Sequence, residues 1–497
     1  MRRAYAHLAR RFAKLAAIED SLAVLGWDTA AMMPEGGAPA RAHQVAVLKG
    51  IAHATLTARG TEALLDKAAS EALGPWEKAN LALMRRRWAH AAAVPARLVE
   101  AFSKACSESE IVWRRARAKD DFAMARPHLE RVLDLTHRIA DAKAKGLGLS
   151  PYEALMDSFE PGLTQATLDR LFGQLEPALK ALLPRVLEAQ GPEPLPLPGP
   201  FPIAGQAALG LRAMRLLGFD FEHGRLDVSA HPFCGGVPED VRITTRYDEA
   251  DFFRSLLSVL HETGHALYEQ GLPKEWRDQP VGQALGMALH ESQSLIVEMQ
   301  AGRSPAFLAF LAPLVAEELG VSGPAFGGAN LVRLATRVRR SLIRVDADEV
   351  TYPLHVILRY RLETALIAGA LAVKDLPQAW NDGMRELVGV VPANDREGCL
   401  QDIHWYDGAF GYFPSYTLGA ILAAQFFQAA VAAVPVIPTA LGQGEFAPLL
   451  AWLRANVHRR GAQVSAEALV AQATGRALSP EPFLAHLERR YLGSATL

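Results

Sequence analysis

The chain has 497 residues, of which 50% are hydrophobic and 21% charged, so it can bury a sizeable core and is not globally disordered. Its 52 basic and 54 acidic residues give a formal net charge of −2, which offers no electrostatic reason to expect nucleic acid or a membrane surface as a partner. The three cysteines (Cys106, Cys234 and Cys399) form no CxxC pair, which argues against a disulfide framework and a thiolate zinc finger and favours a cytoplasmic setting.

The N-terminal part is predicted to be a succession of helices. Residues 1–20 carry charge throughout and lack the apolar run of a signal peptide, so we expect none. Residues 1–190 are rich in Ala, Leu, Arg and Glu at helical spacing. The Met-Pro-Glu-Gly-Gly cluster at 33–37 predicts a turn between two of these helices.

A proline-rich segment follows at 191–202. Its prolines exclude a helix or a central strand. Because helical patterning resumes at Ile203 without a shift in composition, we expect an ordered surface loop and not a linker between domains. The sequence therefore predicts one domain over 1–497, made of a helical part (1–190), this loop and a third part (203–497) that carries the chemistry described below.

Only one region is typical of β-structure. Residues 231–236 resemble a turn, and residues 241–247 (VRITTRY) alternate β-branched side chains as a strand does. The longest apolar stretch, 418–438, is interrupted by Gln425, Gln428 and Pro435, so we expect a buried core helix and not a membrane span.

Residues 261–265, His-Glu-Thr-Gly-His, carry the strongest chemical signal. The preceding apolar residues at helical spacing place them on a helix, where His261 and His265 share one face and can bind one metal ion. Glu262 is rotated by about 100° and lies beside the ion, where it can take a proton from a water on the metal. The alternative, two solvated histidines on a surface helix, is disfavoured by the apolar run.

A catalytic zinc site usually has three protein ligands. Position 271 is a glycine, which excludes a third histidine six residues after His265. Glu291 is the next candidate, provided that a hairpin of two helices brings it against the first helix. Glu298, two turns further on, is expected to be a solvated or paired helical residue.

Several separated motifs make the chain resemble the carboxypeptidase Taq family of metallocarboxypeptidases over nearly its whole length. Besides HETGH, they are Trp27-Asp28 with the segment 33–38, His231-Pro232-Phe233, 240–247, His290-Glu291-Ser292-Gln293, 343–348 (IRVDAD), 398–405 (GCLQDIHW) and 411–416 (GYFPSY).

The resemblance implies a mainly α fold: a large helical zincin body (gluzincin, neurolysin-like) with a deep cleft and a small β-sheet at its edge, usually as a homodimer. It implies His261, His265 and Glu291 as metal ligands and Glu262 as the catalytic base. The metal is most simply Zn²⁺, with Co²⁺ or Mn²⁺ as alternatives. The implied reaction is removal of single residues from peptide C-termini, with broad side-chain tolerance and poor cleavage at proline.

Charge on the tetrahedral intermediate calls for hydrogen-bond donors. Related helical zincins supply a His and a Tyr from this part of the chain, so we predict His404 and Tyr416. Tyr412 is the competing phenol, and His404 has the alternative of a structural residue bonded to Asp402.

A carboxypeptidase also has to recognise a free C-terminal carboxylate, for which an Arg fork is best suited. We predict Arg344, with Arg246 as second choice; a solvated basic helix face at 333–344 is the alternative. The strand at 241–247 either pairs with extended substrate backbone or belongs to an ordinary hairpin. For the histidine ligands, Asp346, Asp348 and Asp402 are possible hydrogen-bond partners.

Two other functions remain open at this stage. One is another zincin activity (oligopeptidase, dipeptidase or aminopeptidase), which HExxH does not distinguish. The other, a noncatalytic helical scaffold, is disfavoured because Glu262 and Glu291 are both in place.

Overall fold

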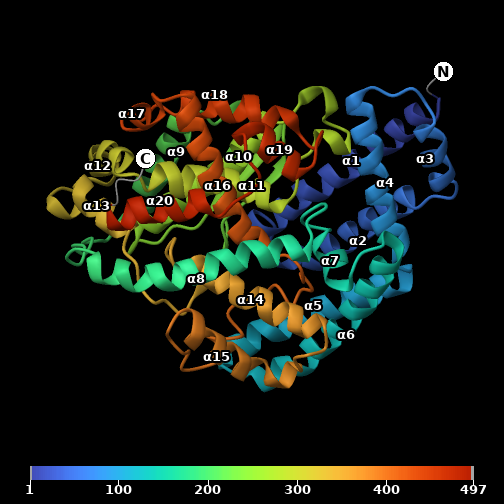
Figure 1. Ribbon diagram of the computed structural model, residues 1–497, viewed down its shortest axis with the longest axis horizontal. Coiled ribbons are helices and arrows are strands. Elements are labelled where there is room, and N and C mark those ends of the chain that lie inside the picture. The colour runs from blue at the N-terminus through green and yellow to red at the C-terminus, as the bar shows by residue number, and fades with distance from the viewer. Residues whose placement is uncertain (1–2, 494–497) are drawn as a thin grey trace.

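Helices make up most of the structure, a computed structural model that describes residues 3–493 (Figure 1). The predicted mainly α fold with one small sheet is confirmed. The N-terminal part contains α1 (Arg3–Ala31), α2 (Ala38–Leu56), α3 (Thr61–Ala69), α4 (Pro75–Ala93), α5 (Ala96–Lys119), α6 (Phe122–Leu147), α7 (Pro151–Met156) and α8 (Gln165–Ala189).

The predicted turn at 33–37 separates α1 from α2, and residues 191–202 form a loop that ends where α9 (Ile203–Leu217) begins. The largest hydrophobic core takes residues from both sides of this loop. A smaller core joins α1, α3 and α4, and a third lies between the sheet, α9 and α10.

The sheet has the order β1-β3-β2, from β1 (Gly224–Val228), β2 (Phe233–Val237) and β3 (Asp240–Thr245). β1 is parallel and β2 antiparallel to β3. The strand expected at 241–247 is therefore present, but the turn expected at 231–236 is wrong from Phe233 onward. The sequence Phe-Cys-Gly-Gly-Val lacks the β-branched alternation of a strand. Because β3 is the central strand, it has no free edge. Of the two alternatives for this strand, pairing with a peptide substrate is therefore wrong, and the hairpin is present as the antiparallel pair of β2 and β3.

α10 (Phe252–Gly271) carries the HETGH motif. Asp251 caps its first turn by accepting a hydrogen bond from the backbone N–H of Arg254, and the apolar residues before the motif are buried. α11 (Met287–Leu295) follows and continues into a π-helical segment, Ile296–Gly302. Such wider turns often occur at functional sites.

The remaining helices surround this pair. They are α12 (Pro305–Leu319), α13 (Gly328–Ala335), α14 (Tyr352–Ile367), α15 (Leu376–Leu387), α16 (Pro414–Ala433), α17 (Ile437–Leu441), α18 (Ala447–Asn456), α19 (Ala466–Thr474) and α20 (Glu481–Leu492). Figure 1 places α10, α11 and α16 together near the middle of the molecule.

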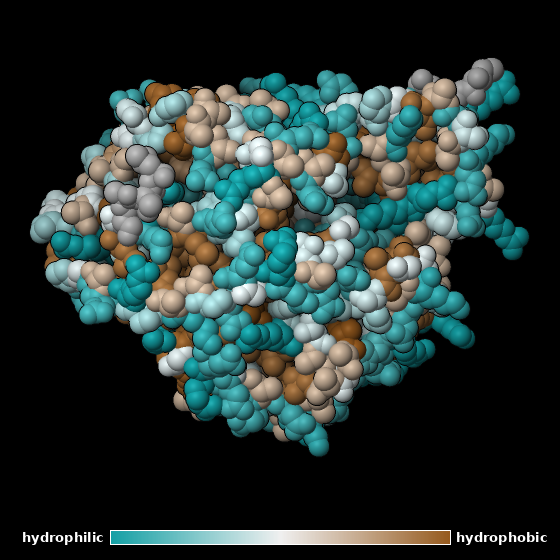
Figure 2. All heavy atoms as spheres, in the orientation of Figure 1, coloured by the Kyte–Doolittle hydropathy of each residue, from teal (hydrophilic) through white to brown (hydrophobic). Residues whose placement is uncertain are grey.

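By length and composition, α16 is the one helix of the described part that could span a membrane. Of its most apolar window, 61% is buried inside the protein, which matches the predicted buried core helix as far as Ala433; the rest of the stretch 418–438 leaves this helix and enters α17. On the face in Figure 2, apolar side chains lie in scattered groups among polar ones.

Candidate metal centre

Three side chains from two helices converge on one point. His261 and His265 lie one turn apart on α10, and Glu291 reaches them from α11. The distances from Oε2 of Glu291 are 3.7 Å to Nε2 of His261 and 3.3 Å to Nε2 of His265. One ligand atom from each residue can be chosen so that all three lie within 4.8 Å of one another. The helical hairpin anticipated from the sequence therefore brings Glu291 to the histidine pair.

Two glycines allow the backbones to come this close. A Cβ at Gly264, inside the HETGH motif, would lie 2.5 Å from the carbonyl oxygen of Gln293 and 2.6 Å from Cα of Ser294. On the other side of α11, a Cβ at Gly419 of α16 would lie 2.6 Å from Cγ of Glu291. Glycines on both neighbouring helices, Gly264 on α10 and Gly419 on α16, thus allow Glu291 to lie between them.

In both histidines, His261 and His265, the Nδ1 atom, which points away from Glu291, has a hydrogen-bond acceptor. Nδ1 of His261 lies 2.9 Å from Oε2 of Glu298, and Nδ1 of His265 lies 3.1 Å from the carbonyl oxygen of His290. With the ring protons on Nδ1, both Nε2 lone pairs face Glu291. Two imidazole nitrogens and one carboxylate fit a catalytic zinc site that leaves a fourth position open.

His290 adds a second contact behind His265. Its Nδ1 lies 2.6 Å from Nδ1 of His265, and its Nε2 lies 2.8 Å from Oε1 of Glu269. A proton on Nε2 of His290, donated to Glu269, leaves Nδ1 of His290 as an acceptor for His265. This arrangement favours the same ring orientation as the carbonyl does.

The aspartates suggested as partners of the ligands lie elsewhere, so that suggestion is wrong. Asp346 binds Arg254, Asp348 accepts backbone N–H groups near its own turn, and Asp402 binds two arginines. The partner from a side chain is Glu298, in the π-helical segment. The sequence predicted that Glu298 is either solvated or paired. The structure shows it paired with His261 and Arg303, and buried.

Charge is balanced tightly in this interior. Burial opposes ionisation of Glu298, but Arg303 and His261 lower its pKa to about 2. Burial also opposes a charge on His261, yet Glu291 and Glu298 raise its pKa to about 10. Because a metal ion would take the lone pair of Nε2, metal binding competes with protonation of this ring.

Glu262 is 7% exposed, and burial raises its pKa to about 7. A pKa near neutrality suits a group that takes up and returns a proton. Its neighbours His261 and Glu291 act on that pKa in opposite directions. The structure thus places Glu262, buried, beside the candidate ligands that act on its pKa.

His404 and Tyr416 meet each other, with Nε2 of His404 3.0 Å from the phenol oxygen. Burial lowers the pKa of His404 to about 4 and raises that of Tyr416 to about 12, so both are neutral near pH 7. The ring of Tyr412 lies 5.2 Å from that of Tyr416, so it stays a competing phenol. The alternative for His404 gains little support, since its Nδ1 is 3.9 Å from Asp402.

Arg344 is buried, with its guanidinium carbon 4.6 Å from the centre of the Tyr416 ring. Its Nε and Nη2 donate to Oδ1 of Asp402. Arg359 of α14 donates to the other oxygen of that carboxylate. The second choice, Arg246, follows β3 and is exposed.

The sequence reasoning missed the role of Arg359 and Glu298. Both were visible as charged residues inside apolar helical runs, LHVILRYRL and SLIVEMQ. A charge in such a run is seldom buried without a partner. That signal identifies both positions but not the partner of either.

Comparison with known proteins agrees with this geometry. A family model described as carboxypeptidase Taq (M32) metallopeptidase matches residues 7–491. The chain belongs to this family. The predicted family and enzyme class, a metallocarboxypeptidase, are thereby confirmed.

Relatives and solved structures match the chain over almost its whole length. Thermostable carboxypeptidase 1 of Thermus thermophilus is 40% identical, with 94% of each chain covered. The Trypanosoma cruzi metallocarboxypeptidase 1 structure is 42% identical with a TM-score of 0.97, covering 99% of this chain and 100% of that one. The M32 carboxypeptidase of Deinococcus radiodurans R1 is 38% identical with a TM-score of 0.92 and 98% coverage of both.

We expect Gly264→Ala to weaken metal binding and lower stability. The added methyl group meets backbone atoms of α11, so the helices have to move apart, at a cost of about 1–3 kcal/mol. Thermal unfolding and a chelator-competition titration measure the two effects. Gly173→Ala in α8, where a Cβ has open space, is the matched control. Equal metal affinity in both variants would contradict the proposed role of the close contact.

We expect Glu298→Gln to weaken metal binding by about 10–100-fold, because the neutral amide is a poorer acceptor for His261. Zinc affinity measured against a chromophoric chelator tests this. Glu188→Gln, an exposed change on α8, should leave the affinity unaltered. A Glu298→Gln affinity within twofold of the unaltered protein would show that Glu298 does not support the ligand.

Proposed function

We propose that the chain removes single residues from the free C-termini of peptides, with a divalent metal held by His261, His265 and Glu291. The observation that carries this proposal is the convergence of those three donors beside the buried Glu262. The names of the relatives, carboxypeptidase and metallocarboxypeptidase, support the direction of cleavage.

In the proposed mechanism, Glu262 moves the proton. A divalent metal, when bound, polarises the scissile carbonyl and makes the attacking water more acidic. The carboxylate of Glu262 takes the proton of that water and delivers it to the leaving amine. Burial, which raises the pKa of Glu262 to about 7, makes its carboxylate a better acceptor for the proton of the water, and the protonated carboxyl is still acidic enough to donate to an amine.

Tyr416 is our choice of donor to the oxygen that becomes negative. Its hydroxyl can accept a hydrogen bond from Nε2 of His404 and donate its own proton to the substrate oxygen. In that arrangement His404 acts through Tyr416. In an alternative arrangement, with the phenol turned away, Nε2 of His404 would itself donate to the substrate oxygen. Tyr412 remains the competing phenol.

Arg344 is our candidate for recognising the substrate carboxylate. Asp402 holds Nε and Nη2, which fixes the guanidinium plane beside Tyr416. Among the described residues, no hydrogen bond involves Nη1, so this nitrogen can donate to a substrate. Arg359 supports the arrangement by binding the second oxygen of Asp402.

The finer properties of the enzyme are also proposals. The N,N,O donor set and the open fourth position favour Zn²⁺, although Co²⁺ and Mn²⁺ use the same ligand types. Broad side-chain tolerance and a homodimer follow from the family resemblance, and a cytoplasmic setting follows from the three free cysteines, which suit a reducing compartment.

We expect Glu262→Gln to keep the metal and to lose at least about 100-fold in kcat, because the amide cannot accept the proton of the water. Metal content per chain and steady-state rates on one peptide give both readouts. A variant with near-normal kcat would remove Glu262 from its role. A variant without metal would show that Glu262 is part of the ligand set.

A time course by mass spectrometry tests the direction of cleavage. We expect a free-acid peptide to shorten one residue at a time from the C-terminus, an N-acetylated copy to behave in the same way, and a C-terminally amidated copy to resist. Chelator should stop the shortening and added Zn²⁺ should restore it. Equal cleavage of the amidated copy would overturn carboxylate recognition, and loss from the N-terminus would overturn the carboxypeptidase assignment.

A further inference from the structure

A cavity of about 630 Å³ lies past the C-terminal end of α10. None of the residues that line it belongs to the candidate metal centre or to the groups proposed to act on substrate. Its volume falls within the range of about 300–1,000 Å³ typical of small-molecule sites. Its walls come from four separate parts of the chain: the start of α4, the segment after α9, the end of α10 with its following turn, and the end of α18 with its following turn.

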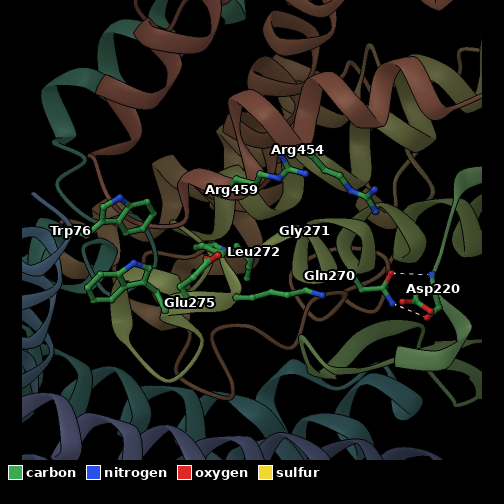
Figure 3. Close-up of a pocket in the computed structure, with 11 residues that line it drawn as sticks. Trp76, Asp220, Gln270, Gly271, Leu272, Glu275, Arg454 and Arg459 are labelled. Atoms are coloured by element: carbon green, nitrogen blue, oxygen red, sulfur yellow. Dashed lines mark hydrogen bonds between the residues drawn. The ribbon is translucent and has the colours of Figure 1, made fainter.

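Three cations line the cavity. The side chains of Arg454, Arg459 and Lys274 form no hydrogen bond or ion pair with any residue of the described range 3–493. Figure 3 shows Arg454 and Arg459 on the same wall. Burial and the nearby charge of Arg459 lower the pKa of Arg454, so the two guanidinium groups lie close enough to repel each other. A bound anion would relieve this repulsion.

One acid of the lining, Asp220, attracts Arg454 and partly offsets the lowering of the Arg454 pKa by burial and by Arg459. Oδ2 of Asp220 lies 2.7 Å from Nδ1 of His223. The backbone N–H and carbonyl of Asp220 both hydrogen-bond with the side-chain amide of Gln270. Glu275 stands toward the tryptophan end of the cavity in Figure 3. The lining thus carries three cations and two acids, which leaves the cavity with a net positive charge.

The opposite end of the cavity is aromatic. Trp76 and Trp276 stack with ring centroids 5.7 Å apart and an interplanar angle of 10°. Both are half-buried and both line the cavity. An indole wall of this kind favours a flat ring, whereas a guanidinium pair with a lysine favours a phosphate group.

We propose that this cavity binds a phosphorylated small molecule with a flat ring, of the nucleoside phosphate class. The phosphate group lies between Arg454, Arg459 and Lys274, and the ring lies against the tryptophan pair. This is a binding site in addition to the peptidase centre, and it does not depend on the peptidase proposal.

Isothermal titration of the metal-loaded protein with AMP, adenosine and inorganic phosphate tests the proposal. We expect AMP to bind once per chain with a Kd below about 1 mM, and adenosine and phosphate to bind at least about tenfold more weakly, because each keeps only one part of the contacts. The double variant Arg454→Gln/Arg459→Gln should weaken AMP binding at least about tenfold. The control Arg97→Gln/Arg170→Gln, which removes two exposed cations elsewhere, should bind AMP as the unaltered protein does.

Three results would overturn the proposal. The first is no binding of AMP to the unaltered protein. The second is AMP binding that survives in Arg454→Gln/Arg459→Gln, as binding to the metal would. The third is phosphate binding as tightly as AMP, which would exclude a contribution of the tryptophan wall.

Discussion

The close contact between α10 and α11 at Gly264 is the constraint on which the site depends. The sequence separation of His265 and Glu291 is 26 residues, and only tertiary packing brings them to 3.3 Å. Glycine at 264 removes the side chain that would keep the helices apart, and glycine at 419 does the same where α16 meets α11. A ligand set on rigid helices is positioned more accurately than one on loops.

A chain of buried charges continues from this contact to the last helix. Glu298, which holds His261, binds Arg303 at 2.6 Å, and Arg303 lies 4.0 Å from Glu349. Glu349 in turn binds Arg490 of α20 at 2.6 Å. Because a buried charge without a partner is costly, each member needs the next. The orientation of a metal ligand therefore rests on residues as distant in sequence as the C-terminal helix.

Local sequence patterns predicted the elements that are regular and missed those that depend on neighbours. The helical spacing of apolar residues predicted α10 and the helix that carries Glu291, because both helices bury a continuous apolar face. β2 escaped detection because two of its five residues are glycines, and only its pairing with β3 makes it a strand.

The same limit applies to the candidate site. Spacing on one helix was enough to pair His261 with His265, since the period of the helix fixes their common face. The hydrogen-bond acceptor for His261 could not be predicted in this way, because Glu298 lies on a different helical segment, the one that continues α11. Arg344 was selected for its fork, but sequence could not show that Asp402 already occupies two of its nitrogens.

Anomalous diffraction at the zinc edge, from crystals grown with Zn²⁺, tests the central claim most directly. The account predicts one ion per chain with Nε2 of His261, Nε2 of His265 and a carboxylate oxygen of Glu291 at about 2.0–2.2 Å. An ion bound by other residues, or by the two histidines with Glu291 turned away, would contradict it.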